Sequence, residues 1–189
     1  FAVLALQVLK KLAPDYVIVA WDKPKTNIRS RRNLYPQYKA NRKPMPQDLR
    51  DQIPVLRELL TGFNWPLLEV DDFEADDIMA TLTRQASKAG LRTVLVTSDL
   101  DVLQAVDEDT DVCLLKKGLT NIVMYDRESF TKEYGMTPDQ FIDYKALKGD
   151  SSDNVPGVAG IGDKTARDLI QKFGTLEGVY QHLEEIPAT

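Results

Sequence analysis

The hydrophobic positions of this chain follow two patterns. Residues 15–22 (DYVIVAWD) and 92–101 (RTVLVTSDLD) are short apolar runs rich in β-branched and aromatic side chains, which predicts strands covered on both faces. Between them, apolar residues recur at helical spacing in residues 48–63 and 73–90, and Pro54 either kinks the first of these helices or marks its true start. Strands that alternate with helices predict an α/β fold with a parallel sheet flanked by helices.

The second half of the chain has clear element boundaries. Residues 111–125 suggest a β-hairpin that turns at Gly118, and residues 126–135 suggest a short helix. Residues 137–149 carry the signature of a capping box, with proline in the first turn and glycine at the end, and residues 163–174 form another helical pattern. We therefore expect two helices joined by a glycine-rich loop.

The N-terminal residues are apolar enough to raise the question of a signal peptide or a membrane span. No basic region precedes them, no small-residue cleavage site follows them, and the stretch is too short and too interrupted by polar residues to span a bilayer, so we expect neither. Its apolar residues instead follow one face of a helix: Phe1, Leu4, Ala5, Val8, Leu9 and Leu12. Because the chain begins with phenylalanine inside this pattern, we expect a fragment of a longer protein without a membrane partner.

Composition and charge refine this picture. A chain of 189 residues that is 43% hydrophobic can bury a core, and its single cysteine, Cys113, fits a reducing compartment, so we expect a cytoplasmic monomer. The net charge of −5 argues against a nucleic-acid partner only if charge is spread evenly. Residues 23–47 contain eight lysines and arginines and no acid, which leaves 16 bases against 29 acids elsewhere. We expect this basic strip to be a mobile arm that contacts single-stranded DNA.

Acidic residues end both predicted strands and open the helix between them. Ligands of parallel sheets sit beyond the carboxyl ends of the strands, so the acids there are candidates for a site. Taken one by one, these groups also fit ordinary helix starts and turns. If these carboxylates lie close together, they repel one another unless cations lie between them. Carboxylate oxygens are hard ligands, which favour Mg²⁺ or Mn²⁺ over zinc. The candidate ligands are Asp22, Glu74, Asp76, Asp77, Asp99, Asp101, Asp150 and Asp153.

The glycine-rich stretch at 157–165 (GVAGIGDKT) is a candidate phosphate clamp. It fails the Walker A pattern, because Asp163 stands where lysine is required, and it fails the dinucleotide pattern for want of a further glycine. Glycines that precede a helix let backbone N–H groups approach a phosphate closely. Lys164 and Thr165 could add contacts to a duplex backbone, although a purely structural turn would show the same glycines.

Several motifs together resemble one family. They are Asp22, YKANR at 38–42, FEADD at 73–77, TSDLD at 97–101 and LKGDSSDNVPGVAGIGDKTA at 147–166. These residues are similar to those of the 5′-nuclease (flap endonuclease) family, and most of all to the N-terminal 5′→3′ exonuclease domains of bacterial DNA polymerase I. The similarity runs along essentially the whole chain.

This resemblance implies a fold and an activity. The fold is a PIN/resolvase-like domain over residues 1–136, followed by a helix-three-turn-helix DNA-binding region over residues 137–189. The activity is hydrolysis of DNA at 5′ flaps or 5′ ends, with two or more Mg²⁺ ions and water as nucleophile, in replication and repair. A polymerase domain is the implied neighbour in the full-length protein.

The resemblance also assigns roles to residues. Asp22, Glu74, Asp76 and Asp77 match the first metal cluster, and Asp99, Asp101, Asp150 and Asp153 match the second. Lys39 and Arg42 match the basic pair that contacts the scissile phosphate, and the role of a further arginine stays open between Arg29 and Arg31. The implied DNA contacts are Arg31, Arg32, Tyr38, Gly157, Gly160, Ile161, Gly162, Lys164 and Thr165, with a monovalent cation as a candidate at the 157–162 loop.

The chain departs from the family pattern in two places. The family's first strand, which carries an aspartate, is expected before Phe1, and the spacing between Asp22 and Lys39 is about two residues longer than usual. Two alternatives therefore stay open beside the nuclease: a DNA-binding fragment that lacks one metal ligand, and a PIN-type ribonuclease with the same acids.

Overall fold

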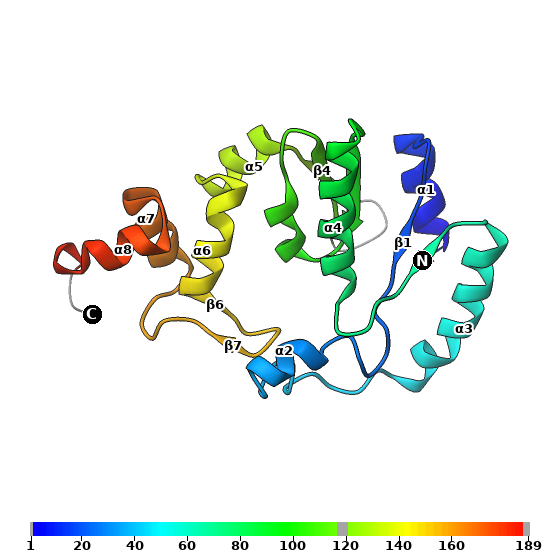
Figure 1. The fold of residues 1–189 in the computed structure, drawn as a ribbon, viewed down its shortest axis with the longest axis horizontal. Coiled ribbons are helices and arrows are strands. Elements are labelled where there is room, and N and C mark those ends of the chain that lie inside the picture. Colours follow the sequence, from blue (N-terminus) through cyan, green and yellow to red (C-terminus); the bar gives the residue numbers. More distant parts are fainter. Residues whose placement is uncertain (1, 117–120, 187–189) are drawn as a thin grey trace. The chain divides into compact units, whose positions relative to one another are not determined.

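A computed structural model describes residues 2–116 and 121–186 and divides the chain into two compact units. The first unit consists of Phe1–Pro36 and Arg42–Met79, and the second of Gln37–Asn41 and Ala80–Thr189. The chain therefore passes from the first unit to the second, back to the first, and again to the second. Figure 1 traces this path by colour.

The first unit is built from short strands and helices. Its elements are α1 (Ala2–Leu12), β1 (Val19–Ala20), α2 (Arg29–Leu34), α3 (Gln47–Gly62), β2 (Leu67–Leu68) and the start of α4 (Ala75–Lys88). β1 and β2 pair in parallel, with Val19 opposite Leu67. The predicted N-terminal helix is confirmed, and Val8 lies at the centre of its buried face. Phe1 lies outside the described residues.

One prediction for this unit needs correction. The strand predicted over 15–22 is paired only at Val19–Ala20, and Tyr16 is 79% exposed, because this run has a partner strand for just two residues. Of the two alternatives for Pro54, the start of the helix is excluded, because α3 begins at Gln47 and Pro54 lies inside it. The basic strip contains the short helix α2, and its expected role as a mobile arm stays a prediction.

The second unit contains a three-stranded sheet. β3 (Thr93–Thr97) pairs in parallel with β4 (Thr110–Leu115), which pairs antiparallel with β5 (Ile122–Tyr125). The predicted hairpin of β4 and β5 is confirmed, while its turn at Gly118 lies outside the described residues. The 3₁₀ helix η1 (Leu100–Ala105) follows β3, and Asp99 caps it by accepting a hydrogen bond from the Asp101 amide. The parallel strands thus belong to two separate sheets, one in each unit.

Helices complete the second unit and enclose an aromatic core. They are α5 (Arg127–Tyr134), α6 (Pro138–Lys148), α7 (Asp163–Phe173), α8 (Leu176–Gln181) and the 3₁₀ turn η2 (Leu183–Glu185). Phe130 stacks on Tyr134 with 4.6 Å between ring centroids, and Phe141 packs edge-on against both. Burial of these rings fixes α5 and α6 together.

Local signals set the ends of these helices as predicted. The Gln140 side chain accepts a hydrogen bond from the Thr137 amide at 2.9 Å at the start of α6. Gly135 ends α5 and Gly149 ends α6, both with positive φ. Between α6 and α7 the chain forms a short antiparallel pair that the sequence did not reveal, β6 (Gly149–Asp150) with β7 (Val155–Pro156).

Candidate active site

The first acid cluster lies at the start of α4 in the first unit. Glu74 is 3% exposed, and its backbone amide donates a hydrogen bond to Asp77 at 2.9 Å. Arg31 donates two hydrogen bonds to the Asp77 carboxylate, at 2.6 and 2.8 Å, and its Nε lies 3.3 Å from Glu74 Oε2. A guanidinium thus lies between two of the predicted metal ligands.

Two further predicted ligands belong to the same unit. Asp22 follows β1 and accepts a hydrogen bond from the Ala75 amide at 2.9 Å, so its carboxylate caps the N-terminus of α4. Burial raises the pKa of Asp76, and the nearby Glu74 and Asp77 carboxylates raise it further. This pKa direction is the physical mark of carboxylates crowded in a desolvated place, where a cation is stabilising.

The second acid cluster lies in the second unit, around a lysine of α6. Lys145 Nζ is 2.7 Å from Asp101 Oδ1 and 2.7 Å from Asp150 Oδ2. The other oxygen of Asp150 accepts hydrogen bonds from the Ser152 amide at 2.8 Å and the Ser152 hydroxyl at 2.7 Å. Burial alone would raise the pKa of Asp150, but the bonds from Lys145 and Ser152 hold it well below its usual range.

An open cleft of about 390 Å³ coincides with this cluster. Burial raises the pKa of Asp101, and Lys145 only partly offsets that rise. Three aspartates and one lysine line the cleft. Its lining residues are Ser98, Asp99, Leu100, Asp101, Lys145, Asp150 and Ser152.

The segment Gln37–Asn41 is fastened to the loop that carries Asp150 and Asp153. The Tyr38 hydroxyl donates to Asp153 Oδ2 at 3.0 Å, and the Lys39 amide donates to the Asp153 carbonyl at 2.8 Å. Lys39 Nζ is 3.6 Å from Asp153 Oδ2, and its side chain is 11% exposed. The Asn41 side chain donates to the Ser151 carbonyl at 2.8 Å. Two predicted functional residues, Tyr38 and Lys39, thus lie beside a predicted metal ligand.

The donor sets of both clusters have the chemistry of a hard-cation site. All the predicted ligands offer carboxylate oxygens, which suit Mg²⁺ or Mn²⁺. Within residues 2–116 and 121–186, no three acidic, histidine or cysteine side chains are grouped closely enough to hold an ion as they stand. Each cluster instead has a basic side chain in its midst, Arg31 in one and Lys145 in the other. The residues therefore fit divalent cations in ligand type, while an ion would have to take the place of the basic side chain in each cluster.

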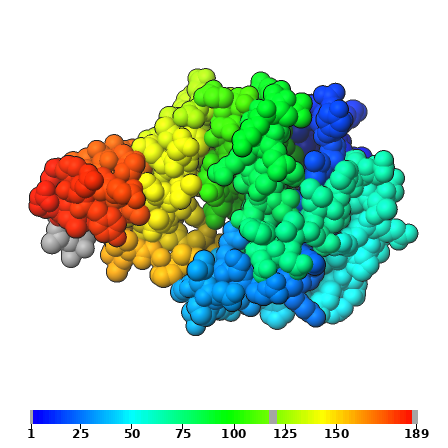
Figure 2. Space-filling view, in the orientation of Figure 1, coloured from blue at the N-terminus to red at the C-terminus, as the bar shows by residue number. Residues whose placement is uncertain are grey.

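The glycine loop combines a packing role with an exposed edge. A Cβ on Gly157 would lie 2.3 Å from the Lys148 backbone, and one on Gly149 would lie 2.2 Å from the Gly157 amide nitrogen. These two glycines therefore allow two backbones to touch. Gly160 has φ of +82°, and a Cβ on Gly162 would meet nothing within 4 Å. The loop lies at the surface beside the yellow helix α6 in Figure 2, so the space around Gly162 is open to a ligand.

The start of α7 is held by a polar network. Asp163 accepts hydrogen bonds from the Tyr144 hydroxyl, from Lys148 at 3.0 Å and from Arg167 at 3.0 Å. These bonds hold the pKa of Asp163 well below its usual range, with the Tyr144 bond as the largest cause. The next residues, Lys164 and Thr165, are exposed, as contacts to a phosphate backbone require. Ile161 is half-buried in the loop.

The remaining basic residues of the strip differ in their partners. Lys23 pairs with Asp71 at 2.6 Å, and Arg29 pairs with Asp72 through two hydrogen bonds at 2.6 and 2.7 Å. Asp71 and Asp72 are not predicted ligands, so Arg29 lies outside the acid cluster that Arg31 enters. Arg32 and Arg42 are exposed.

Lys145 and Ser152 lie in the second cluster, and neither of them was predicted from the sequence. Lys145 lies in α6, five residues before Asp150, and the helix ends between the two residues. Because the direction of the chain after the helix is not evident from the sequence, the contact between their side chains was not predicted. The available signal was a lysine on the helix that leads into the acidic loop. Tyr38 and Lys39 were found through their motif.

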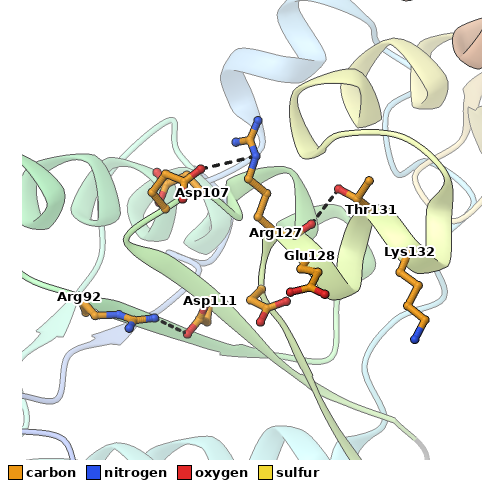
Figure 3. Close-up of a pocket in the computed structure, with 9 residues that line it drawn as sticks. Arg92, Asp107, Asp111, Arg127, Glu128, Thr131 and Lys132 are labelled. Atoms are coloured by element: carbon orange, nitrogen blue, oxygen red, sulfur yellow. Dashed lines mark hydrogen bonds and ion pairs between the residues drawn. The ribbon is translucent and has the colours of Figure 1, made fainter.

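A second cleft lies elsewhere in the second unit and contains no predicted site residue. It has a volume of about 730 Å³, and two of its ion pairs are Arg92 with Asp111 at 3.2 Å and Arg127 with Glu108 at 3.7 Å. Figure 3 shows Arg92 beside Asp111. No helix of the described residues is long and apolar enough to cross a bilayer.

Comparison with known proteins bears on the same residues. Residues 1–135 match the family model described as 5′-3′ exonuclease, N-terminal resolvase-like domain, and residues 136–189 match 5′-3′ exonuclease, C-terminal SAM fold. DNA polymerase I of Caldicellulosiruptor bescii is 42% identical over 191 residues, which covers 100% of this chain and 22% of the relative. DNA polymerase I of Bacillus subtilis is 37% identical, over 98% of this chain and 21% of the relative. The chain thus spans about a fifth of these curated relatives.

Solved structures agree on the fold. The 5′-exonuclease of bacteriophage T5 with bound zinc has a TM-score of 0.78 at 23% identity, over 98% of this chain and 70% of that chain. The T5 flap endonuclease in a pseudo-enzyme-product complex with DNA and metal ions has a TM-score of 0.79 at 23% identity, over 97% of this chain and 69% of that chain. With family models that cover it from end to end, this chain belongs to the 5′-3′ exonuclease family.

Proposed function

We propose that the chain is a structure-specific 5′→3′ exonuclease and flap endonuclease domain that hydrolyses DNA phosphodiesters with two or more divalent ions. The observation that carries the proposal is the attachment of the Tyr38–Lys39 segment to Asp153. A phosphate-binding cation beside a carboxylate ligand is what phosphodiester hydrolysis requires, because the developing negative charge needs stabilisation where the ion acts.

Each group of residues has a role in this proposal. Asp22, Glu74, Asp76 and Asp77 would hold one ion, and Asp99, Asp101, Asp150 and Asp153 another. Mg²⁺ at these clusters, with Mn²⁺ as a substitute, would activate water and stabilise the leaving oxygen. Tyr38 orients Asp153 through its hydroxyl, and Lys39 binds the scissile phosphate together with Arg42. Of the two candidate arginines, Arg31 is favoured over Arg29, because Arg31 contacts two of the ligands.

The DNA duplex would be held by the second unit. The open surface at Gly162, the exposed Lys164 and Thr165, and the N-terminus of α7 offer donors to phosphate oxygens without reading bases. The structures of the T5 flap endonuclease and of the Rad2 catalytic core, with a TM-score of 0.51 for the latter, contain DNA by their own descriptions. The substrate proposed for this chain is DNA with a 5′ flap or a 5′ end at a duplex junction.

The proposal extends to the protein's organisation. A catalytic domain over residues 1–136 and a DNA-binding region over 137–189 would act as a monomer in the cytoplasm, covalently linked to a polymerase domain as in the relatives named DNA polymerase I. The monovalent cation suggested for the 157–162 loop would assist binding of the duplex.

A labelled 5′-flap duplex tests the proposal directly. We expect cleavage near the flap junction in Mg²⁺ but not in Ca²⁺, with tight binding in both. Asp150→Asn and Asp77→Asn should each reduce cleavage about 10³-fold, because an ion stabilises the transition state by several kcal/mol and each 1.36 kcal/mol is tenfold in rate. Glu177→Gln, on the exposed surface of α8, is the matched control. Cleavage that survives EDTA and both aspartate variants would overturn the proposal.

The two alternatives make different predictions in the same assay. Binding without cleavage in Mg²⁺ would identify a catalytically incomplete DNA-binding fragment. Preferential cleavage of single-stranded RNA would identify a PIN-type ribonuclease with the same acids.

A further inference from the structure

Lys145 occupies an unusual position in the second acid cluster. Its Nζ is equidistant, at 2.7 Å, from an oxygen of Asp101 in η1 and an oxygen of Asp150 in β6. Lys145 thereby bridges η1 and β6. The oxygens it contacts are among those that the proposed function assigns to a divalent ion.

The hydrogen bonds of Asp150 show why this bridge matters. One oxygen of Asp150 accepts bonds from the Ser152 amide and the Ser152 hydroxyl. The other oxygen, Oδ2, accepts from Lys145, and both residues line the cleft. A cation that enters the cleft therefore finds Asp150 Oδ2 already bound to the ammonium group of Lys145.

The burial of the three side chains distinguishes this bridge from an ordinary surface ion pair. The side chains of Lys145, Asp101 and Asp150 are 25%, 28% and 17% exposed. Lys145 belongs to α6, whose residues Phe141, Tyr144 and Leu147 are buried in the core. The base of the lysine is therefore fixed, while its four-carbon stem can still move the ammonium in and out of the cleft.

We propose that Lys145 is the resident counter-cation of the second cluster, which competes with the divalent ion for Asp101 and Asp150 and so sets the ion concentration at which the cluster fills. This inference rests on the proposed function, since it assigns a regulating residue to the same site. In the absence of the ion, the ammonium keeps the two carboxylates from repelling each other. When the ion binds, Nζ must leave, because two cations cannot share these oxygens.

The first cluster offers a natural comparison. There Arg31 binds the Asp77 carboxylate through two parallel hydrogen bonds. This bidentate interaction is more directional than the single contact that Lys145 makes with each of its carboxylates. The ammonium of Lys145 is a compact charge on a flexible stem, which makes it the more readily displaced of the two.

Mn²⁺ binding tests the inference without reference to catalysis. The free ion is measured by electron paramagnetic resonance during titration of the wild type, Lys145→Met, Lys145→Arg and Lys148→Met. Lys148 is the matched control, because it lies on the same helix and pairs with a carboxylate, Asp163, outside the cluster. Asp150→Asn identifies which class of binding sites belongs to the second cluster.

The expected result is tighter Mn²⁺ binding in Lys145→Met. Removing a competing positive charge should raise the affinity of the second-cluster class by about tenfold or more, while Lys145→Arg and Lys148→Met stay close to wild type. A lysine that served only to support the fold would give the opposite sign, since its loss would disorder the ligands. Unchanged or weaker binding in Lys145→Met would overturn the inference.

A second measurement keeps the inference testable if Lys145→Met does not fold. Amine acetylation of the wild-type protein, read by mass spectrometry, should increase at Lys145 when Mn²⁺ is added, while acetylation of Lys148 stays constant. Equal labelling of Lys145 with and without Mn²⁺ would contradict displacement. If instead the wild type binds no Mn²⁺ and Asp150→Asn changes nothing, the proposed metal-dependent function fails, which is a separate outcome.

Discussion

The two units of this protein position their acid clusters by different means. In the second unit, Asp150 is oriented by its hydrogen bonds to Ser152, and the helix that carries Lys145 packs on a buried aromatic core. In the first unit, the Glu74 and Ala75 amides donate to Asp77 and Asp22, and the Arg31 side chain adds ion pairs with Glu74 and Asp77. Buried apolar residues are also fewer in that unit, with Val8, Leu60 and Ile78 as its core members.

This difference shows that the side chains of a site can be held in place either by packing and hydrogen bonds or by ion pairs. Backbone hydrogen bonds and packed rings fix ligands at a given place whatever the salt concentration. An ion pair between side chains fixes them only while both charges are present, and it weakens as salt screens them. We expect the second cluster to be preorganised and the first to depend on its arginine.

The largest test of this comparison removes an aromatic ring from the second core. Phe130 is 0% exposed, and Phe130→Ala should lower the free energy of unfolding by about 3–5 kcal/mol, because the ring's contacts are lost and a cavity remains. Urea unfolding followed by circular dichroism measures the change. Mn²⁺ binding at the second cluster should weaken at the same time.

Leu60→Ala is the counterpart in the first unit, where Leu60 is also 0% exposed. It should destabilise the protein without altering the second-cluster class of Mn²⁺ sites in the fraction that remains folded. If Leu60→Ala weakens that class as much as Phe130→Ala, the two units do not organise their clusters independently, and the comparison fails.

A smaller effect is expected from the arginine of the first cluster. Arg31→Met should lower the free energy of unfolding by about 2 kcal/mol, since Glu74 and Asp77 lose charged hydrogen bonds in a partly buried place. Arg29→Met is the matched control, because its pair with Asp72 is exposed to water, and it should cause no measurable change. If both variants lower the free energy of unfolding equally, the total positive charge of the basic strip, and not the specific contacts of Arg31, contributes the stability.

The smallest effect concerns the pH dependence of the second unit. Hydrogen bonds from Tyr144, Lys148 and Arg167 lower the pKa of Asp163, so its contribution to stability is full above its ordinary pKa of 3.8 and is lost as the pH falls through the lower folded-state value. Asp163→Asn should cost about 1 kcal/mol at neutral pH, a modest figure because the carboxylate is 51% exposed.

Urea midpoints of the wild type and Asp163→Asn, measured from neutral pH down into the acid range, check this prediction. The difference between the two proteins should be constant above the ordinary pKa and should shrink below it. A difference that persists unchanged into strong acid would exclude the Asp163 charge as its source.

The helices of the second unit were the most predictable part of the fold. Their ends depend on local chemistry, such as glycine in a left-handed conformation at Gly135 or the Gln140 side chain on the Thr137 amide, and such signals are written within a few residues. The strand over 15–22 was overestimated for the opposite reason. Its length depends on a partner strand, which the local pattern does not specify.

In the candidate site, too, features set by local sequence were predicted and features set by tertiary structure were not. The acids and Lys39 were found from their motifs, but Lys145 was not, because its contact with Asp150 depends on the turn that Gly149 makes at φ of +78°. The attachment of Tyr38 to Asp153, 115 residues away along the chain, likewise depends on tertiary structure. Sequence motifs name candidate ligands, whereas the basic side chains that lie between them are found only in the folded structure.

The interlaced path of the chain has a consequence for its synthesis. Residues 37–41 are grouped with residues 80–189, and the Asn154 side chain donates to the Gln37 carbonyl over a separation of 117 residues. A ribosome releases chains from the N-terminus, so this segment emerges long before the loop that holds it. In the nascent chain, Lys39 is therefore synthesised long before Asp153. Their ion pair can form only after more than three quarters of this sequence has been made.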